Sequence, residues 1–567
     1  MTSSLQELHD RYPKQDKYLT YGTAGFRDRA DLPLASVCAR MGVMAAKRSH
    51  ALSSCVGIMI TASHNAECDN GIKLVDHDGG MLHQNLEPFA VKLANAVNYD
   101  DFVLELKSFE QYIRGVPSTT VFDVEQISLE GQGGVVMVGW DTRPHSPALV
   151  EAVRNGVRAC GALVLELGEV TTPQVHYAVQ DFNYKKWTDA KDFAASVALQ
   201  RYYHTLTNGF VELMDSCIEG DSMDEDDIDM WNVVVDTAFG VGCVALQSMQ
   251  AVLEEQGAAV TLDLRNLARS GPVNDGCGAE LVQKGQIPPA GVDESADKGK
   301  LLCSFDGDAD RVVFHTFGTS RGWALLDGDR IATLIATFLV TELEEAGISK
   351  QFRLGCVQTA YANGASTRYL QSLGVSVAVA KTGVKHLHHA ALFYDLGLYF
   401  EANGHGTVLF SADFLTFVLS AHLDCPNEPR KAMALRRLHA FTQVINQAVG
   451  DSISDMLASL TCMQVLGVDH YGWLDMYTEL PSRQLKCPHA KKGKIKCSED
   501  ETRAVAPEQL QVRLDQAMAK FESGRCFVRP SGTEDVVRVY AEASTQDGAN
   551  ALADECIKAI HDVLDSL

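Results

Sequence analysis

A short apolar run, a turn and then an amphipathic helix recur along the chain, and this pattern constrains the fold more than any other feature. Residues 135–139 form such a run, residues 146–160 have helical periodicity, and residues 162–167 are apolar again. The polar residues 180–192 then interrupt the pattern. Alternation of this kind favours α/β layers built on a mainly parallel or mixed sheet.

Later parts of the chain repeat the pattern twice and then change character. The second unit has strand, helix and strand patterns at residues 231–236, 243–256 and 259–264. The third has a helical pattern at 329–345 and strand patterns at 301–305, 353–359, 376–380 and 394–401. A basic stretch at 486–496, which we interpret as an exposed loop, precedes helix, strand and helix patterns at 506–522, 537–543 and 548–564. This end of the chain predicts a smaller α+β domain.

Size and composition limit the class of protein. A chain of 567 residues is too long for one core, and roughly 150 residues per domain suggests about three or four domains. The net charge of −25 argues against a nucleic-acid-binding surface and requires any anion site to concentrate its cations locally. The 15 cysteines include no Cys-x-x-Cys pair, the N-terminus is polar, and no segment is long and apolar enough to span a membrane. We therefore expect a soluble, cytoplasmic protein.

A serine loop follows one of the apolar runs. Ser63 and His64 come just after the apolar residues 56–60, and Lys73 lies ten positions beyond the serine. Strand ends in α/β sheets are where ligands meet catalytic groups, so a serine there, with cations nearby, can carry a phosphoryl or acyl group. The alternative is a helix N-cap or an Asx turn, which the same residue types favour.

Three aspartates on alternate positions, Asp306, Asp308 and Asp310, follow the apolar run 301–305. In an extended strand such carboxylates would lie roughly 6–7 Å apart, too far to share one ion. Gly307 and Ala309 allow the chain to curl, so that three oxygens can converge. Hard oxygen ligands favour Mg²⁺. The sequence therefore predicts a magnesium site.

Three other interpretations of this acidic loop can be compared with the sequence. An EF-hand is excluded, because its sixth and twelfth positions would be Arg311 and Phe317. A phosphatase of the haloacid-dehalogenase type shares the pattern of residues 308–313, although Asp306 and Gly307 separate that pattern from its strand. A plain acidic turn is the remaining alternative.

A glycine loop at residues 240–245 supports a different hypothesis. It follows a strand pattern, opens a helical pattern and is trailed by Asp263, which is close to the fingerprint of an NAD-binding oxidoreductase. A strand–glycine–helix turn also occurs wherever a helix packs closely on a sheet. The NAD hypothesis leaves Ser63 and the three aspartates unexplained.

Three further loops carry groups suited to a sugar phosphate. The C-terminal loop and the strand after it offer Arg529, Pro530, Ser531, Gly532, Thr533 and Arg538, which together suit an unreacting phosphate, with a capped turn as the alternative. A second loop offers Glu401, Ala402, Asn403 and His405, whose carboxylate and amide can bind sugar hydroxyls or an acetamido group. A third offers Thr382, Gly383, Lys385 and His386.

These loops, in this order, resemble the α-D-phosphohexomutase superfamily. Its signature comprises a serine loop, an Asp-x-Asp-x-Asp metal loop, a Glu-centred sugar loop and a C-terminal phosphate loop. Residues 61–65, 358–364, 381–389 and 400–410 are most similar to the eukaryotic phosphoacetylglucosamine mutase branch. The glucose- and mannose-selective branches usually have serine where Asn403 stands. Ala66 departs from the family, which usually has proline there.

The resemblance implies a fold and a reaction. The implied fold is a heart-shaped arrangement of three α/β domains with mixed sheets and a smaller C-terminal α+β domain around a central cleft. We expect the domains at residues 1–187, 188–300, 301–445 and 446–567. The implied reaction converts N-acetylglucosamine 6-phosphate to the 1-phosphate, on the route to UDP-N-acetylglucosamine. One Mg²⁺ per active site and a sugar 1,6-bisphosphate intermediate are implied as well.

Residue roles follow from the resemblance and are hypotheses here. Ser63 is expected to carry the phosphoryl group, with Asp306, Asp308, Asp310 and a phosphoserine oxygen holding Mg²⁺. Arg27 and Arg311 are expected to steady the moving group. Lys73, which would need a depressed pKa, and His64 compete as the general base. Glu401 and Asn403 are expected to read the sugar, with Thr382 and Gly383 on the same wall, and Arg529, Ser531, Gly532, Thr533 and Arg538 to hold the second phosphate.

Alternatives of other classes remain. A phosphoglucomutase or phosphomannomutase of the same superfamily is the nearest, followed by a Mg²⁺-dependent phosphatase and the NAD enzyme. A catalytically dead scaffold is disfavoured because every key residue is present. The expected partner is a small sugar phosphate, with no nucleic acid and no membrane, and the expected state is a monomer or weak dimer.

Overall fold

The computed structural model describes residues 2–14, 16–22, 25–30, 34–115, 134–184, 193–220, 231–319, 322–421, 428–531 and 535–567. The chain divides into two compact units. The first unit comprises Met1–Leu325 and Ala440–Thr461, and the second comprises Leu326–His439 and Cys462–Leu567.

The first unit begins with a five-stranded mixed sheet in the order β1-β3-β2-β4-β5. Its strands are β1 (Phe26–Arg29), β2 (Val56–Ile60), β3 (Asp69–Val75), β4 (Val135–Trp140) and β5 (Leu163–Glu169). β4 runs parallel to both β2 and β5, whereas β3 is antiparallel to β1 and β2. Parallel strands β2 and β4 therefore end at the same edge, where Ile60 is opposite Trp140.

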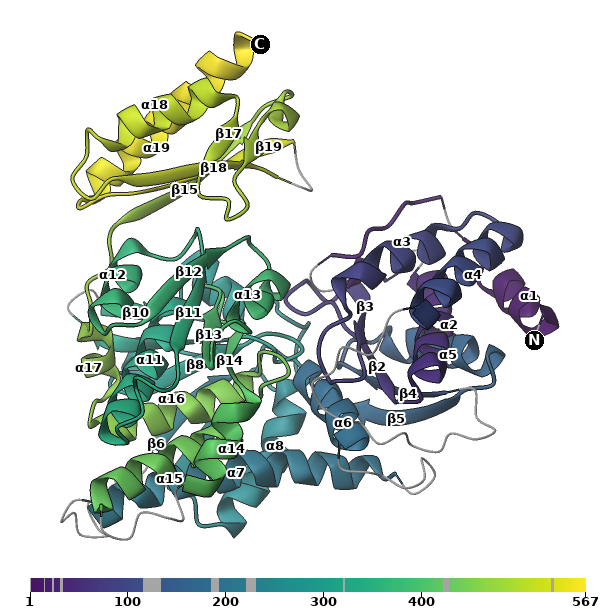
Figure 1. Cartoon of the computed structure of the whole chain (residues 1–567), viewed down its shortest axis with the longest axis horizontal. Helices are drawn as coiled ribbons and strands as arrows, with labels where there is room; N and C mark the ends of the chain where they lie inside the picture. Colours follow the sequence, from purple (N-terminus) through teal and green to yellow (C-terminus); the bar gives the residue numbers. More distant parts are fainter. Residues whose placement is uncertain are drawn as a thin grey trace. The chain divides into compact units, whose positions relative to one another are not determined.

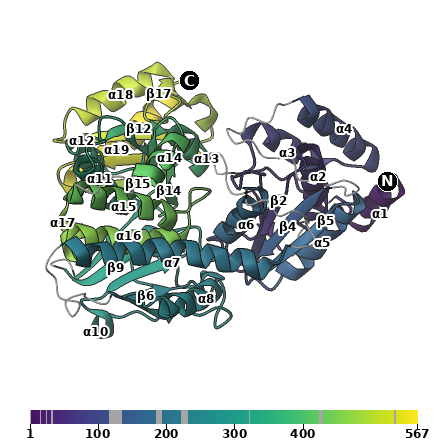
Figure 2. The same ribbon diagram turned by 60° about the horizontal axis from the view of Figure 1, so that its bottom comes forward.

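Side-chain alternation buries both faces of this sheet. Ile58 and Val136 join the core formed with α2 and α5, whereas Met59 and Met137 join the core formed with α6, since successive residues of a strand face opposite sides. Figure 2 shows α5 and α6 on either side of these strands. The helices here are α1 (Thr2–Arg11), α2 (Leu34–Leu52), η1 (Gln84–Leu86), α3 (Glu87–Asn95), α4 (Tyr99–Gly115), α5 (Ser146–Ala159) and α6 (Thr172–Tyr184).

A second five-stranded sheet, in the order β10-β9-β8-β6-β7, follows in the first unit. Its strands are β6 (Trp231–Asp236), β7 (Val260–Arg265), β8 (Leu301–Phe305), β9 (Val312–Thr319) and β10 (Gly322–Leu326). β6 runs parallel to β7 and β8, and β8 is antiparallel to β9. The helices are α7 (Ala195–Gly220), α8 (Gly242–Glu255), α9 (Ala279–Gly285) and α10 (Glu294–Asp297).

One sequence prediction in this region is wrong where the structure describes it, and one helix was missed; residues 185–192 of the polar stretch lie outside the described residues. The polar stretch 180–192 does not break the fold at its start, because residues 180–184 continue α6 and Phe182 is fully buried against the sheet. The 26-residue helix α7 was not predicted. It packs against α6 and α8, so tertiary contacts stabilise it along much of its length.

The second unit contains a four-stranded sheet in the order β12-β11-β13-β14. Its strands are β11 (Leu354–Thr359), β12 (Ser376–Ala380), β13 (Leu396–Phe400) and β14 (Gly406–Phe410). β11 is parallel to β12 and β13, and β14 is antiparallel to β13. The helices are α11 (Gly328–Glu345), α12 (Gly364–Ser372), α13 (Val384–Ala391), α14 (Ala412–Ala421), α15 (Pro429–Val444), α16 (Ser452–Leu466) and α17 (His470–Asp475), of which α15 and α16 run on into the first unit.

The C-terminal part of the second unit is an antiparallel sheet, β15-β19-β18, with α18 and α19 over one face (Figure 1). Its elements are β15 (Ser482–Pro488), η4 (Lys492–Lys494), β16 (Lys496–Cys497), β17 (Ala504–Ala506), α18 (Glu508–Met518), β18 (Arg525–Pro530), β19 (Val536–Glu542) and α19 (Gln546–Asp565). Val528 and Val539 face the helices and join their core. The predicted small α+β domain is confirmed.

Pairing with β19 corrects two local predictions. Lys486, predicted in an exposed loop, lies in β15, and Arg529, predicted in a loop, lies in β18. Both residues are polar, so their own sequence does not indicate a strand. They are in strands because β15 and β18 pair with β19 on its two sides.

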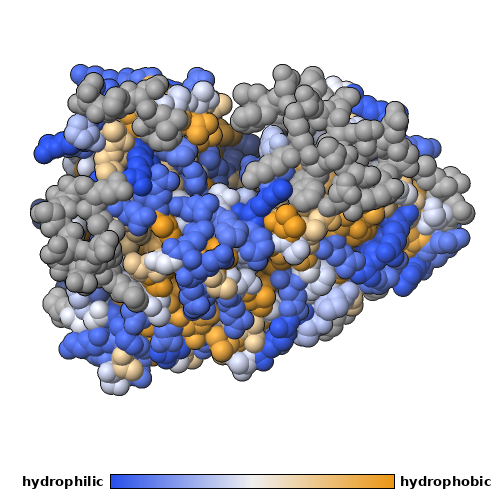
Figure 3. Space-filling view, turned by 90° about the horizontal axis from the view of Figure 1, so that it is seen from below, coloured by the Kyte–Doolittle hydropathy of each residue, from blue (hydrophilic) through white to orange (hydrophobic). Residues whose placement is uncertain are grey.

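None of the described helices is long and apolar enough to cross a bilayer. Where Figure 3 is coloured, hydrophilic residues lie among several apolar areas. Exposed large apolar side chains include Val97, the adjacent pair Leu392 and Phe393, and Leu419. Every cysteine that the structure describes carries a free thiol.

Candidate active site

Ser63 lies in a strained turn directly after β2. Its φ of 54° is in the left-handed region, which is uncommon for a residue other than glycine. The N–H of Ser63 donates to Oγ1 of Thr61 at 2.9 Å, and its hydroxyl donates to Oδ2 of Asp306 at 2.8 Å. The side chain is fully buried. The turn therefore directs the serine hydroxyl at the predicted metal loop.

Arg143, which sequence reasoning missed, holds this turn in place. Its buried guanidinium donates to the carbonyls of Ser63 at 2.9 Å and Asn65 at 2.8 Å, and its Nε donates to Asp141 at 2.9 Å. Asn274 donates to the same two carbonyls at 2.8 and 2.9 Å. A signal was available for Arg143: it follows the run 135–139, and neighbouring parallel strands end at one edge of a sheet.

The three aspartates converge as the curled loop predicts. Carboxylate oxygens of Asp306, Asp308 and Asp310 all lie within 4.8 Å of one another. Ala309 has a φ of 55°, and its N–H donates to the carbonyl of Asp306 at 3.0 Å, which closes the turn. At Gly307 a Cβ would lie 2.8 Å from the carbonyl oxygen of Ser63, so the close approach of the two loops requires glycine.

The residues present fit Mg²⁺. All three aspartates are buried, and Oδ1 of Asp308 has no hydrogen-bond partner among the described residues. Burial, followed by the charges of Asp310 and Asp308, raises the pKa of Asp306 well above its ordinary value. Buried oxygens that lack donors and repel one another are suited to a hard divalent cation.

Lys73 supplies positive charge to this group. Its Nζ lies 2.6 Å from Oδ2 of Asp308 and 2.7 Å from Oδ2 of Asp310, and Thr172 donates to the same Asp308 oxygen at 2.6 Å. Burial lowers the pKa of Lys73, but the two carboxylates outweigh burial and raise it above its ordinary value. The depressed pKa that a general base would need is therefore not found: the ammonium acts as the counter-ion of the aspartates.

The other predicted catalytic residues lie in the same group. Arg27 donates from Nη1 to Oδ1 of Asn65 at 3.1 Å, and Nε of Arg311 lies 3.8 Å from Asp306 and 3.7 Å from Asp310. Burial, then the charges of Arg311 and Arg27, lowers the pKa of His64 below its ordinary value, so the imidazole is neutral. The first unit thus brings together Ser63, His64, Lys73, Arg27, Arg311 and the three aspartates.

The glycine loop that resembled a dinucleotide fingerprint packs on the metal loop instead. The N–H of Val241 donates to the carbonyl of Gly307 at 3.1 Å, and a Cβ at Gly240 would lie 2.4 Å from that oxygen. Contact with the aspartate loop explains this glycine without a cofactor.

The predicted sugar loops meet in the second unit. Oε1 of Glu401 accepts from the N–H of Gly383 at 3.2 Å, and Oε2 accepts from Nδ2 of Asn403 at 3.4 Å. Oδ1 of Asn403 in turn accepts from the N–H of His405 at 3.0 Å. The remaining predicted residues of these loops lie alongside: Thr382 precedes Gly383, Lys385 and His386 are in the first turn of α13, and Ala402 accepts from Gly328.

The predicted phosphate loop is flanked by a row of cations. Lys486, Arg538 and Arg529 are directly opposite one another on β15, β19 and β18, so their side chains share one sheet face. Like charges placed directly opposite one another repel, and an anion bound between them would relieve that repulsion. Lys486 was missed because the sequence alone did not show its partner strand.

The loop between β18 and β19 is held at its ends. The N–H of Ser531 donates to the carbonyl of Val536 at 2.9 Å, and Pro530 is opposite Val537. Nζ of Lys492 donates to the carbonyl of Ser531 at 2.9 Å and lies 3.3 Å from Asp535. The predicted residues Gly532 and Thr533 lie outside the described residues.

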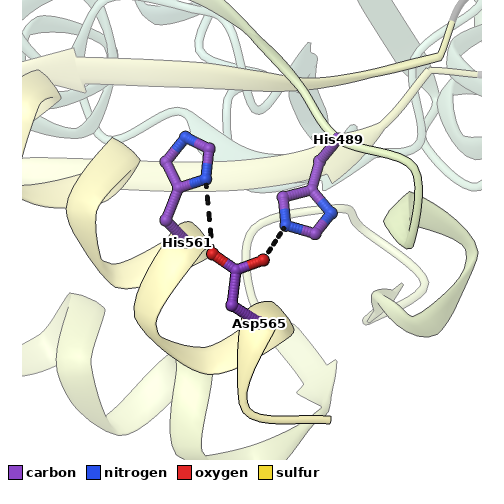
Figure 4. A group of neighbouring side chains, drawn as sticks. All are labelled: His489, His561 and Asp565. Carbon is purple, nitrogen blue, oxygen red and sulfur yellow. Dashed lines mark hydrogen bonds and ion pairs between the residues drawn. The ribbon is translucent and has the colours of Figure 1, made fainter.

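His489, His561 and Asp565 form a second cluster of metal-ligand types, on the C-terminal part of the chain (Figure 4). Nδ1 of His489 accepts from the N–H of Lys491 at 3.1 Å, so Nε2 carries the proton and donates to Asp565 at 3.2 Å. Nε2 of His561 lies 3.5 Å from the thiol of Cys487. Nδ1 of His561 lies 4.0 Å from Oδ2 of Asp565, so each member of the cluster has a partner within the protein.

Family models match most of the chain. The models are the phosphoglucomutase/phosphomannomutase alpha/beta/alpha domain I (residues 40–98 and 122–188), phosphoacetylglucosamine mutase AMG1 domain II (192–313) and domain III (327–468), and the phosphoglucomutase/phosphomannomutase C-terminal domain (492–559). Full-length relatives are equally informative. The phosphoacetylglucosamine mutase of Sus scrofa is 42% identical, over 96% of this chain and 94% of that protein. The chain belongs to the phosphoacetylglucosamine mutase family.

Other members support this assignment. The human phosphoacetylglucosamine mutase is 41% identical over 96% of this chain and 94% of its own length. The structure of Aspergillus fumigatus N-acetylphosphoglucosamine mutase, in complex with GlcNAc-6P and magnesium, superposes with a TM-score of 0.86 at 35% identity and covers 99% of both chains. The predicted superfamily, its branch and the multi-domain α/β architecture are confirmed.

Proposed function

We propose that this phosphoacetylglucosamine mutase family member interconverts N-acetylglucosamine 6-phosphate and N-acetylglucosamine 1-phosphate. The observation that carries the proposal is the hydroxyl of Ser63 bonded to Asp306 within a buried group of three aspartates. The Aspergillus relative has been crystallised with GlcNAc-6P and magnesium, and a variant of it with glucose 1,6-bisphosphate, which supports both the substrate and a bisphosphate intermediate.

In the proposed reaction Ser63 carries a phosphoryl group in the resting enzyme. The free O1 of the sugar attacks phosphorus, the bond from phosphorus to Oγ breaks, and the sugar becomes a 1,6-bisphosphate. The 6-phosphoryl group then returns to Oγ of Ser63, so phosphate is neither gained nor lost. When bound by Asp306, Asp308 and Asp310, Mg²⁺ would neutralise charge on the transferring group.

The chain's own residues position the phosphoryl group, accept the proton and bind the rest of the substrate. Arg27 and Arg311 steady the phosphoryl group on Ser63 by charge. The neutral imidazole of His64 takes the proton of the attacking hydroxyl, since two aspartates hold Lys73 as an ammonium. Arg529, Ser531, Gly532, Thr533 and Arg538 hold the phosphate that is not reacting. Because either phosphate must take this place, a site built on charge and backbone amides suits both. Glu401 and Asn403 read the hydroxyls and the acetamido group.

The biological setting is proposed from the same features. Acidic composition, free thiols and a sugar phosphate substrate support a cytoplasmic enzyme of UDP-N-acetylglucosamine synthesis, monomeric or weakly dimeric, that binds neither nucleic acid nor membrane.

Comparative turnover tests the substrate. We expect N-acetylglucosamine 6-phosphate to be converted with a kcat/KM at least about 10-fold above that of glucose 6-phosphate, since a polar site discriminates by hydrogen bonds left unmade. Equal values would instead assign a phosphoglucomutase. Intact mass spectrometry before and after phosphatase treatment tests whether the resting enzyme carries a phosphoryl group.

A further inference from the structure

Glu501 lies in the turn between β16 and β17, and its side chain is buried although the surrounding loop is polar. It is 8% exposed, and its φ of 59° is in the left-handed region. The turn is fixed locally: the N–H of Glu501 donates to the carbonyl of Ser498 at 3.0 Å, and the N–H of Thr502 donates to Asp500 at 3.1 Å. A strained backbone held by neighbours points to a side chain whose position matters.

The carboxylate of Glu501 joins two loops that the sequence separates. Its Oε2 accepts from the N–H of Thr382 at 3.1 Å and from the hydroxyl of Thr382 at 2.6 Å. Nη1 of Arg529 lies 3.3 Å from Oε1 and 3.4 Å from Oε2. One buried carboxylate therefore binds both the loop before α13 and the arginine at the end of β18.

The contacts continue to the sugar loop. Gly383, next to Thr382, donates its N–H to Glu401, which accepts in turn from Asn403. A hydrogen-bonded path thus runs from Arg529 through Glu501, the Thr382–Gly383 backbone and Glu401 to Asn403. Its two ends are the residues proposed to grip the phosphate and to read the acetamido sugar.

The contact with Glu501 orients Arg529 and leaves one nitrogen of its guanidinium available to a ligand. Its Nε donates to the hydroxyl of Tyr361 at 3.0 Å, and Nη1 faces Glu501. Nη2 donates to none of the described residues. A guanidinium fixed through two of its nitrogens presents the N–H groups of the third in one direction, toward which an anion can bind.

We propose that Glu501 is a positioning residue that sets the spacing between Arg529 and the Glu401–Asn403 pair, and so selects ligands in which a phosphate and a sugar ring are joined. The inference rests on the proposed function. The inference goes beyond that function because Glu501 contacts neither reacting group and acts through Arg529 and Thr382. If the charge of Glu501 mattered only as an anion, its removal would strengthen phosphate binding, which is the opposite expectation.

Kinetics of Glu501→Gln and Glu501→Ala, with the exposed Glu499→Gln as the matched control, test the proposal. We expect KM for N-acetylglucosamine 6-phosphate to rise about 10-fold in Glu501→Ala and about 3-fold in Glu501→Gln, because charged hydrogen bonds are lost in steps. We expect kcat to change less than about 3-fold. The inhibition constant of inorganic phosphate, which needs no spacing, should stay within about 2-fold of the wild type.

Several outcomes would overturn the proposal. A lower KM would mean that Glu501 competes with the substrate phosphate, and a parallel rise in KM and in the phosphate constant would mean that it only maintains the loop. Unchanged kinetics would remove its role altogether. Where Glu501→Ala fails to fold, Glu501→Gln and Thr382→Val decide instead. Failure of the proposed function is seen separately, because the wild type would then not turn over N-acetylglucosamine 6-phosphate. In that case, calorimetric binding of the sugar phosphate to the variants would still decide the role of Glu501.

Discussion

The two regions that carry chemistry treat charge in opposite ways. In the first unit, Ser63, Lys73 and the three aspartates are buried, and Lys73 is bound to two carboxylates at 2.6 and 2.7 Å. In the second unit, Arg529 and Arg538 are half-buried and stand directly opposite each other on paired strands, with Lys486 beyond.

The difference follows from what each region has to bind. Transfer chemistry needs groups whose positions do not relax, and burial with paired charges provides this at the cost of desolvation. Under the proposed function, a phosphate that comes and goes is bound by cations gathered on one sheet face, where a bound anion relieves their mutual repulsion. Substitutions in the first region should therefore reduce stability or turnover, and substitutions in the second should reduce affinity for the sugar phosphate.

Replacement of Ser63 by alanine should have the largest effect. We expect turnover to fall on the order of 10³-fold or more, since the group that accepts the phosphoryl is removed. Sugar phosphate binding, measured by calorimetry, should stay within a few-fold of the wild type because the recognition loops lie elsewhere. Full activity in this variant would contradict the proposed mechanism.

Replacement of Arg143 by alanine should break the first region structurally. Its buried guanidinium satisfies the carbonyls of the serine turn and the carboxylate of Asp141, so its loss leaves several buried groups unpaired. We expect a loss of about 3–5 kcal/mol in the free energy of unfolding, measured by urea denaturation. The surface substitution Arg158→Ala serves as the control, and a change as small as the control's would show that the turn does not depend on Arg143.

Replacement of Arg538 by alanine should show the opposite behaviour. Removal of one of two facing cations relieves repulsion, so we expect no loss of stability. KM for the sugar phosphate should rise about 10- to 100-fold through the lost charged hydrogen bonds, with a smaller change in kcat. A destabilised protein with normal KM would reverse the comparison between the regions.

Replacement of Asn403 by serine should alter specificity more than rate. We expect the preference for N-acetylglucosamine 6-phosphate over glucose 6-phosphate to narrow about 5- to 10-fold, because one hydrogen bond to the acetamido group is lost. Competition between the two substrates measures the ratio directly. An unchanged ratio would show that Asn403 does not read the acetamido group.

Replacement of Lys486 by alanine should have the smallest effect. This exposed end of the cation row should change KM by about 3-fold, since a solvated charge interacts weakly. Added salt should abolish the difference. Lys494→Ala, on the neighbouring η4, should leave KM unchanged, and equal effects of the two variants would show that only net charge matters.

Much of the site could be predicted from local sequence. Gly307 and Ala309 between alternating aspartates indicate a curled metal loop, and the structure has that turn, with Ala309 in the left-handed region. Apolar runs before Ser63 and Asp306 indicate that both loops leave buried strands, as they do. Such features depend on a few adjacent residues, whose backbone preferences act at short range.

Residues that work through distant partners could not be predicted in this way. Arg143 serves Ser63 from 80 positions away, and Glu501 reaches Thr382 from 119 positions away. Lys486 became part of the cation row only through the pairing of β15 with β19. Lys73 would need a depressed pKa to act as the general base, but its pKa is raised, because two aspartates more than 200 positions away bind it.

The sequence by itself determined which functional groups the chain carries, the order of its loops and the strands that deliver them, because these depend on residue chemistry and local periodicity. Only the tertiary structure decided which charges lie against opposite charges and which lie beside charges of the same sign. The physical reason is that charge interactions depend on burial and on distance between groups, and packing alone sets both.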